Sequence, residues 1–127
     1  MMVRVVGFDH LVLLCSDVER SLRFYCDQLG LEAVRVEQWR QGEAPFPSVR
    51  VDATTIIDLL AGVRTGMNLD HFCLVLGSTD LHAIVASGEF DVVGKGAVGG
   101  LFGAQGFATG LYVRDPDGNV VELRCYG

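Results

Sequence analysis

The chain has 127 residues, which is enough for one compact domain, and we expect residues 1–127 to form a single domain. Half of the residues are hydrophobic and 20% are charged, a balance typical of a folded chain. Ten basic against sixteen acidic side chains give a net charge of −6, which argues against a protein that binds nucleic-acid phosphates.

Uninterrupted apolar runs in the sequence are short. Runs such as Leu11–Cys15 and Phe72–Leu76 fall far below the ~20 residues that a bilayer-spanning helix needs. Charged residues and a histidine interrupt the first ten residues, so no signal-peptide core is expected there. The sequence therefore predicts no membrane segment and, by default, a cytoplasmic location.

The first half of the chain predicts a strand, a helix and three further strands. Residues 4–14 have a strand pattern, and Ser16 and Glu19 have the spacing of a capping box, which starts a helix. An apolar stripe at helical spacing follows, made of Val18, Leu22, Tyr25 and Leu29. Gly30 suits the left-handed residue that ends a helix. The three further strands are expected over residues 32–40, 46–52 and 54–60.

The second half predicts the same order of elements. A strand over residues 69–76 precedes cap residues at 78–80 and a short helix that Gly88 ends. Further strands are expected near residues 90–93, 108–114 and 119–126, with a turn at 115–118 before the last one.

A glycine-rich segment lies between two of these strands. Gly94–Gly99 fits the letters of a dinucleotide-binding motif, but that motif must follow a strand and open a helix, and here more glycines follow. We therefore expect a loop, either one that closes over a ligand or a connector without function.

The two halves also match residue by residue. Asp9–Leu14 aligns with Asp70–Val75, and Ile56–Leu59 aligns with Val120–Leu123. The sequence thus predicts an α+β fold built from two βαβββ modules, over approximately residues 4–62 and 68–126.

Four polar residues occupy equivalent places in the two modules: His10, His71, Asp58 and Glu122. Each lies in an apolar strand, where an isolated carboxylate needs a partner. A curved sheet would gather these side chains on its concave face, and two imidazoles with one or two carboxylates are a common ligand set for a divalent metal.

Other interpretations of these residues remain. Both histidines are also compatible with buried, hydrogen-bonded core residues, with the carboxylates as surface groups. Cys73 shares a strand face with His71 and could replace one carboxylate in a zinc site. Arg114 and Arg124 are expected to be surface or rim charges, with contact to an anionic substrate as the alternative.

The sequence resembles the vicinal oxygen chelate superfamily, which has the glyoxalase and bleomycin-resistance fold. The resemblance lies in Asp9–Leu13, in the segment Ser21–Gly30 with its Phe-Tyr pair, and in Tyr112–Leu123, and it covers nearly the whole chain. It implies paired βαβββ modules forming a curved mixed-sheet cup. It also implies metal ligands at His10, His71, Asp58 and Glu122, although glyoxalase I usually has Glu where Asp58 stands.

The resemblance implies a metal-dependent enzyme that chelates vicinal oxygens of a small oxygenated substrate. Glyoxalase-like lyase or isomerase chemistry is the leading expectation, with Asp58 or Glu122 as the catalytic base and Zn, Ni, Mn, Fe or Co as the divalent metal. The alternatives are a metal-free, bleomycin-resistance type of binding protein, a dioxygenase and a fosfomycin-type thiol transferase.

We also expect a homodimer. A small chain rich in apolar residues gains burial by dimerising, and the short connector at residues 61–67 has two glycines that suit a hinge. In the family, the ligands come from one subunit or are divided between two, and the sequence does not decide between these arrangements.

Overall fold

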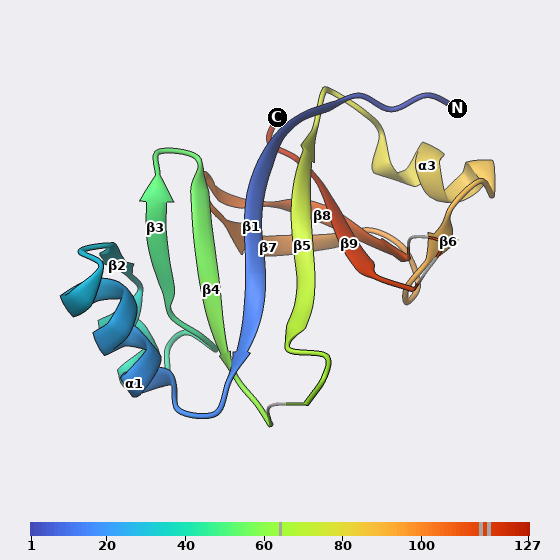
Figure 1. The fold of residues 1–127 in the computed structure, drawn as a ribbon. Helices are drawn as coiled ribbons and strands as arrows, with labels where there is room; N and C mark the ends of the chain where they lie inside the picture. The colour runs from blue at the N-terminus through green and yellow to red at the C-terminus, as the bar shows by residue number, and fades with distance from the viewer. Residues whose placement is uncertain (64, 115, 117) are drawn as a thin grey trace. The chain divides into compact units, whose positions relative to one another are not determined.

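The computed structural model describes residues 1–63, 65–114, 116 and 118–127 (Figure 1). The chain forms two compact units, which we call unit 1 (Met1–Asp9 with His71–Gly127) and unit 2 (His10–Asp70). Strands β1 (Val5–Cys15) and β5 (Leu69–Leu76) each pass from one unit into the other. Residue 64 of the connector and residues 115 and 117 of the predicted turn lie outside the described residues.

Unit 2 contains a mixed sheet in the order β2-β3-β4-β1. Its further strands are β2 (Glu32–Val34), β3 (Ser48–Asp52) and β4 (Thr55–Ala61). Strand β4 runs parallel to β1 and antiparallel to β3. The first and last strands of this module are therefore hydrogen-bonded neighbours.

The helical part of unit 2 consists of α1 (Val18–Leu22), the π-helix η1 (Arg23–Gln28) and α2 (Val36–Arg40). Asp17, next to the expected Ser16, caps α1 by accepting a hydrogen bond from the Arg20 amide. The core of this unit consists of Cys15, Val18, Leu22, Val49 and Leu59. Leu29 is 56% exposed, because the wider π-helical winding rotates it away from the predicted apolar stripe.

The strand predicted over residues 32–40 is wrong in its second half. Strand β2 ends at Val34, and Arg35 adopts a left-handed backbone conformation with φ of 58°. This turn directs the chain into α2, where the Trp39 amide donates to the Arg35 carbonyl. Alternating apolar residues do not reveal such a left-handed break, because it is a property of the backbone of one residue.

Unit 1 contains a mixed sheet in the order β5-β9-β8-β6, with β7 paired to β8. Its elements after β5 are α3 (Leu81–Ser87), β6 (Asp91–Val92), β7 (Val98–Gly103), β8 (Gly106–Arg114) and β9 (Val120–Cys125). Strand β9 runs parallel to β5 and antiparallel to β8. The relation of first to last strand is thus the same as in unit 2.

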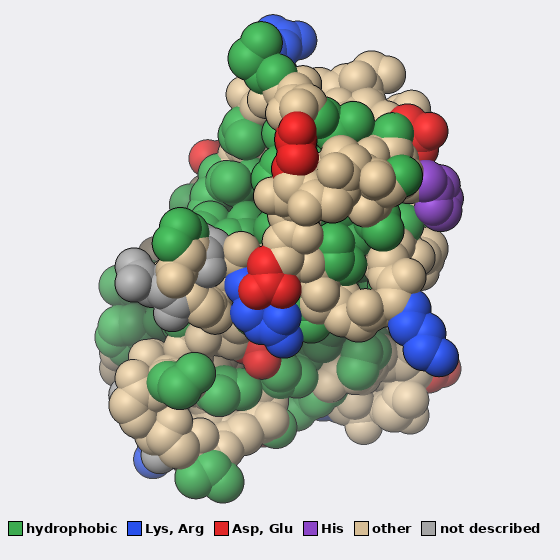
Figure 2. All heavy atoms as spheres, turned by 90° about the vertical axis from the view of Figure 1, so that its right-hand side faces the viewer, with side chains coloured by type: hydrophobic (Ala, Val, Ile, Leu, Met, Phe, Trp, Pro, Cys, Tyr) green, Lys and Arg blue, Asp and Glu red, His purple; other side chains and the backbone are tan. Residues whose placement is uncertain are grey.

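Helix α3 has the predicted caps. The Asp80 side chain accepts from the His82 amide, and Gly88 ends the helix in the left-handed conformation. Leu81 and Ile84 bury their side chains in a core with Leu111 and other residues of β8 and β9. On the side of α3 and β6 that Figure 2 shows, hydrophobic and charged side chains are mixed.

The loop predicted from the glycine-rich segment is partly a strand. Strand β7 and strand β8 form a hairpin in which Phe102 lies opposite Phe107 and Gly103 opposite Gly106. The glycines hide this strand in the sequence, since glycine is typical of loops. The hairpin packs over the Arg124 side chain of β9.

The predicted α+β fold of βαβββ modules is confirmed, with α2 and β7 as additional elements. Among the described residues, no helix is long and apolar enough to span a membrane.

Candidate functional site

In unit 2, the structure brings His10 and Asp58 together. They lie on the neighbouring parallel strands β1 and β4, where Val12 is the residue opposite Asp58. The His10 Nε2 and Asp58 Oδ2 atoms are 3.7 Å apart, and both side chains are buried. Ser48, opposite Asp58 on β3, donates its hydroxyl to Asp58 Oδ1 at 2.6 Å. The carboxylate is thus held between two strands.

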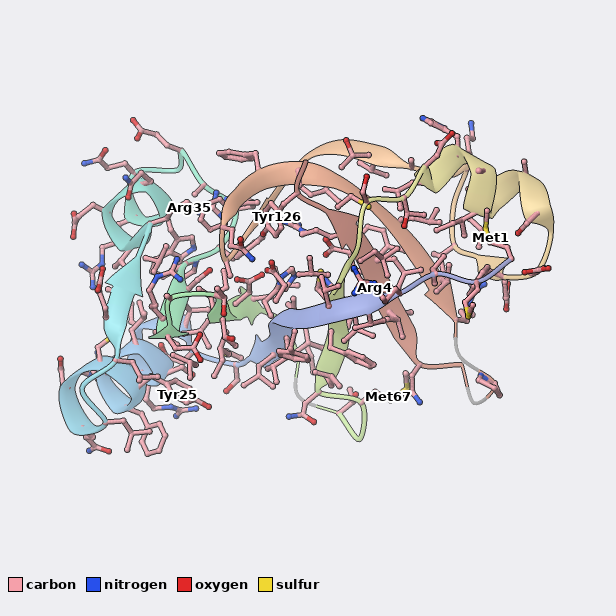
Figure 3. All side chains as sticks on the ribbon, turned by 90° about the horizontal axis from the view of Figure 1, so that it is seen from above. Met1, Arg4, Tyr25, Arg35, Met67 and Tyr126 are labelled. Atoms are coloured by element: carbon pink, nitrogen blue, oxygen red, sulfur yellow. The ribbon has the colours of Figure 1, made fainter. Side chains whose placement is uncertain are left out.

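Arg35 lies close enough to this pair to respond to its charge. Burial lowers the pKa of the Arg35 guanidinium, and the negative charge of Asp58 partly opposes this effect. The guanidinium stacks on the Phe46 ring at 5.1 Å and donates to the Phe46 carbonyl at 3.4 Å. Figure 3 labels Arg35. A guanidinium that senses the charge of Asp58 is therefore part of the surroundings of this pair.

In unit 1, the structure brings His71 and Glu122 together. They lie on the neighbouring parallel strands β5 and β9, and the His71 Nε2 and Glu122 Oε1 atoms are 3.3 Å apart. The His71 ring packs edge-to-face against Tyr112 of β8, with ring centroids 5.2 Å apart. Glu122 is 1% exposed. Each unit therefore holds one imidazole beside one carboxylate, across its parallel pair of strands.

Arg124 is a buried partner of Glu122, and its prediction as a surface or rim charge is wrong. Its side chain is 0% exposed, and Nε and Nη2 donate to Glu122 Oε2 at 2.8 and 2.7 Å. Burial alone would lower the pKa of Arg124, but the charge and hydrogen bonds of Glu122 outweigh burial and raise it. The β7–β8 hairpin, which the sequence does not reveal, accounts for this burial. Arg114 lies at the surface as predicted, 3.2 Å from Asp91.

Tyr126, labelled in Figure 3, extends the network to the start of β1. Its hydroxyl donates to Asp9 Oδ2 at 2.6 Å, and Asp9 Oδ1 accepts the Ala104 amide at 2.8 Å. Burial, followed by the bond to Asp9, raises the pKa of Tyr126 to about 12. The sequence prediction missed this network. Its available clue is that Glu122, Arg124 and Tyr126 stand at every second position of the strand predicted over residues 119–126, which places them on one face.

The donor types in both units suit a divalent cation, and the spacing in unit 1 fits one directly. Two ligand atoms bound to one metal at about 2.1 Å lie roughly 3.0–3.4 Å apart at angles of 90–109°. The separation of 3.3 Å in unit 1 lies within this range, whereas the 3.7 Å in unit 2 is slightly longer and would have to shorten on binding. Imidazole nitrogen and carboxylate oxygen are ligands for Zn, Ni, Mn and Fe. Each unit thus contains a similar pair of donor groups, an imidazole nitrogen and a carboxylate oxygen.

Paired βαβββ modules with an imidazole and a carboxylate on matching parallel strands define a class of protein. The sequence profile of the Glyoxalase/Bleomycin resistance protein/Dioxygenase superfamily matches residues 7–123, a range that includes all four predicted site residues. The chain belongs to this superfamily, and the predicted resemblance is confirmed.

Three similar proteins illustrate the range of the superfamily. Virulence protein STM3117 of Salmonella typhimurium is 30% identical to this chain, and the match covers 93% of this chain and 83% of that protein. The crystal structure of methylmalonyl-CoA epimerase from Mycobacterium tuberculosis has a TM-score of 0.65 at 16% identity, covering 97% of this chain and 89% of that one. The Mn(II)-bound glyoxalase from Novosphingobium aromaticivorans has a TM-score of 0.64 at 20% identity, covering 98% of this chain and 40% of that one.

The superfamily includes enzymes, among them an epimerase and a glyoxalase. The two structural neighbours establish the fold of this chain.

Proposed function

We propose that this protein is a metal-dependent enzyme with glyoxalase-like lyase or isomerase chemistry. A divalent cation would be held by His10, Asp58, His71 and Glu122, and the substrate would be a small molecule with vicinal oxygens. The observation that carries this proposal is the repeated pair. Each unit has an imidazole Nε2 facing a carboxylate oxygen, at 3.7 and 3.3 Å, across its parallel strands.

The similar proteins support both parts of the proposal. One structural neighbour is a Mn(II)-bound glyoxalase, which supports a divalent metal, and another is an epimerase, which supports an isomerisation. When bound, the cation would supply a Lewis acid that stabilises negative charge on substrate oxygens.

Of the two carboxylates proposed as the base, Asp58 suits the role better. Glu122 Oε2 receives two hydrogen bonds from the buried Arg124 guanidinium, which stabilises the anion and makes it a poorer proton acceptor. Asp58 Oδ1 accepts from the neutral Ser48 hydroxyl and Oδ2 faces His10, while the Arg35 guanidinium acts on Asp58 through its charge. We therefore assign proton removal from carbon to Asp58 and a binding role to Glu122.

Metal binding by purified variants tests the site. The parent is expected to bind a divalent cation from the series Zn, Ni, Mn, Fe and Co. Calorimetric titration of His10→Ala, His71→Ala and Glu122→Ala should show affinity losses beyond the 10–100-fold typical of residues outside the ligand set.

The matched control is His82→Ala, which removes the exposed histidine of α3 and should leave binding unchanged. If the three site variants bind the cation as tightly as the parent, the assignment of the ligands is wrong.

One observation favours a second candidate, a metal-free protein that binds a small ligand. Arg124 already compensates the charge of Glu122 inside unit 1, so this carboxylate is stable in a buried place without a cation. A parent that binds none of the five metals, yet binds a small oxygenated molecule without turnover, would support this candidate.

A further inference from the structure

The two oxygens of Glu122 have different partners within unit 1. Oε1 lies 3.3 Å from His71 Nε2, whereas Oε2 accepts both the Nε and the Nη2 hydrogens of Arg124, at 2.8 and 2.7 Å. Charge-assisted bonds of this kind are short and strong, and they fix geometry as well as charge. The carboxylate therefore directs Oε2 to Arg124 and Oε1 to His71.

All the N–H donors of the Arg124 guanidinium have acceptors within the protein. A guanidinium has five N–H donors. Besides the two bonds to Glu122, Nη2 donates to the Phe102 carbonyl, and Nη1 donates to the Gly106 carbonyl and to the Tyr126 hydroxyl. These five bonds account for all five donors, so Arg124 retains none for an anionic substrate. Its hydrogen bonds hold other groups of the protein in place, and two of the five go to Glu122.

The β7–β8 hairpin is shaped around this guanidinium. A Cβ atom at Gly103 would overlap Nη1 and the central carbon of Arg124 as well as the Tyr126 hydroxyl. Only glycine at this position leaves room for the buried arginine. The Ala104 amide, next in the chain, is bonded to Asp9, which fixes the hairpin tip. The glycine-rich segment that the sequence predicts as a loop thus provides, at Gly103, the space that the Arg124 side chain occupies.

We propose that Arg124 is a positioning residue that restricts Glu122 to binding a cation through Oε1 alone. This inference rests on the proposed function, because it assumes that Glu122 is a metal ligand. A carboxylate that uses one oxygen takes one coordination position instead of two. With six positions, four ligand residues that each use one atom would leave two positions for a chelating substrate, whereas a Glu122 bound through both oxygens would leave only one. Arg124 would thereby keep the cation open to two vicinal oxygens.

The test uses Co²⁺ as the probe, because its visible absorption reports the number of ligands and weakens as that number rises. In Arg124→Met, the released Glu122 should bind through both oxygens, and the molar absorptivity of bound Co²⁺ should fall by about half or more. Gly103→Ala keeps the arginine and its charge but displaces it, so it should change the spectrum in the same direction. Arg124→Lys should restore part of the parental spectrum, since an ammonium can hold one oxygen.

Tyr126→Phe is the matched control. It removes one of the five bonds of Arg124 and leaves both bonds to Glu122, so its Co²⁺ spectrum should match that of the parent. Circular dichroism establishes which variants are folded, because Arg124→Met leaves a buried carboxylate uncompensated. Gly103→Ala and Arg124→Lys retain the charge and keep the test decisive if Arg124→Met does not fold.

The possible results distinguish the positioning role of Arg124 from the metal site of the proposed function. A parental Co²⁺ spectrum in folded Gly103→Ala and Arg124→Met would overturn the positioning role while leaving the metal site intact. Tighter Co²⁺ binding in Arg124→Met with an unchanged spectrum would also overturn it, since that is the effect of removing a nearby positive charge. A parent that binds no Co²⁺ or other divalent cation would overturn the proposed function, and this inference with it.

Discussion

At the scale of single residues, the two equivalent carboxylates differ in their surroundings. Asp58 accepts from a neutral hydroxyl of β3, whereas Glu122 is bonded twice by a buried guanidinium. A buried carboxylate with no partner is unfavourable, so each needs such a donor. In the proposed function, this difference supports Asp58 as the base and Glu122 as a ligand.

The Tyr126 hydroxyl should make stability depend on pH in the alkaline range. Its folded pKa of about 12 lies above the ordinary value of 10.0, so the folded state holds this proton more tightly than the unfolded state. The stabilisation is fully present below pH 10 and is lost as the pH rises through 12. Tyr126→Phe should lower the free energy of unfolding by about 1–2 kcal/mol at pH 8, and this difference should shrink between pH 10 and 12.

Urea unfolding at a series of pH values measures this difference. Tyr25→Phe, which removes a hydroxyl from a different unit, is the control and should show no such trend. A difference between parent and Tyr126→Phe that stays constant up to pH 12 would contradict the prediction.

At the scale of elements, the parallel strand pairs determine the site. In each unit the first and last strands of the module are hydrogen-bonded neighbours, β1 with β4 and β5 with β9. A histidine on the first strand and a carboxylate on the last strand must then lie near each other when they share a face. The site therefore follows from strand topology combined with the period-two alternation of strands.

The short helix α3 should depend on its cap. The Asp80 side chain accepts from the His82 amide, one of the amides at the start of the helix that lack a carbonyl partner within it. Asp80→Ala should lower the free energy of unfolding by about 1 kcal/mol, as measured by thermal and urea unfolding. Asp27→Ala, an exposed aspartate outside a cap position, is the control. Equal stability of the two variants would show that the cap contributes nothing.

Much of the fold could be predicted from the sequence because capping residues and strand periodicity are local. The caps of α3 and the strands that carry His10 and His71 follow from such signals. Two elements could not be predicted. Helix α2 depends on one left-handed residue, Arg35, and β7 is rich in glycine because it encloses an arginine. Both depend on packing, which a local pattern does not contain.

The candidate site was predictable to the same extent. The pairing of His10 with Asp58 and of His71 with Glu122 follows from repeated residues in repeated strands. The burial of Arg124 could not be predicted, because a charged residue near the end of a strand is usually exposed. It is buried because Glu122 and two carbonyls of the hairpin satisfy its donors.

At the scale of the whole molecule, we expect a homodimer. Val5, Val6 and Phe8 at the start of β1 are 50%, 53% and 40% exposed, which is apolar surface that a second copy could cover. Light scattering at micromolar concentration should therefore give the mass of two chains. A monomer with intact metal binding would contradict this expectation.

Subunit mixing then tests whether a site is shared between two chains. In a dimer with shared sites, a mixture of His10→Ala and Glu122→Ala subunits regains one intact site and part of the activity. Absence of recovery despite proven subunit exchange would place each site within a single chain.

The passage of β1 from unit 1 into unit 2 has a consequence for how the chain folds. Unit 1 needs Asp9 beside Ala104 and Tyr126, so its two segments must meet across the whole of His10–Asp70. Closing a flexible loop of that length costs about 4 kcal/mol of chain entropy, and the cost falls once the loop itself is compact. Unit 2 is continuous in sequence and carries no such cost. The cost of loop closure thus favours folding of unit 2 before unit 1. The network around Arg124, which includes Asp9, is then completed only after half of the protein has formed.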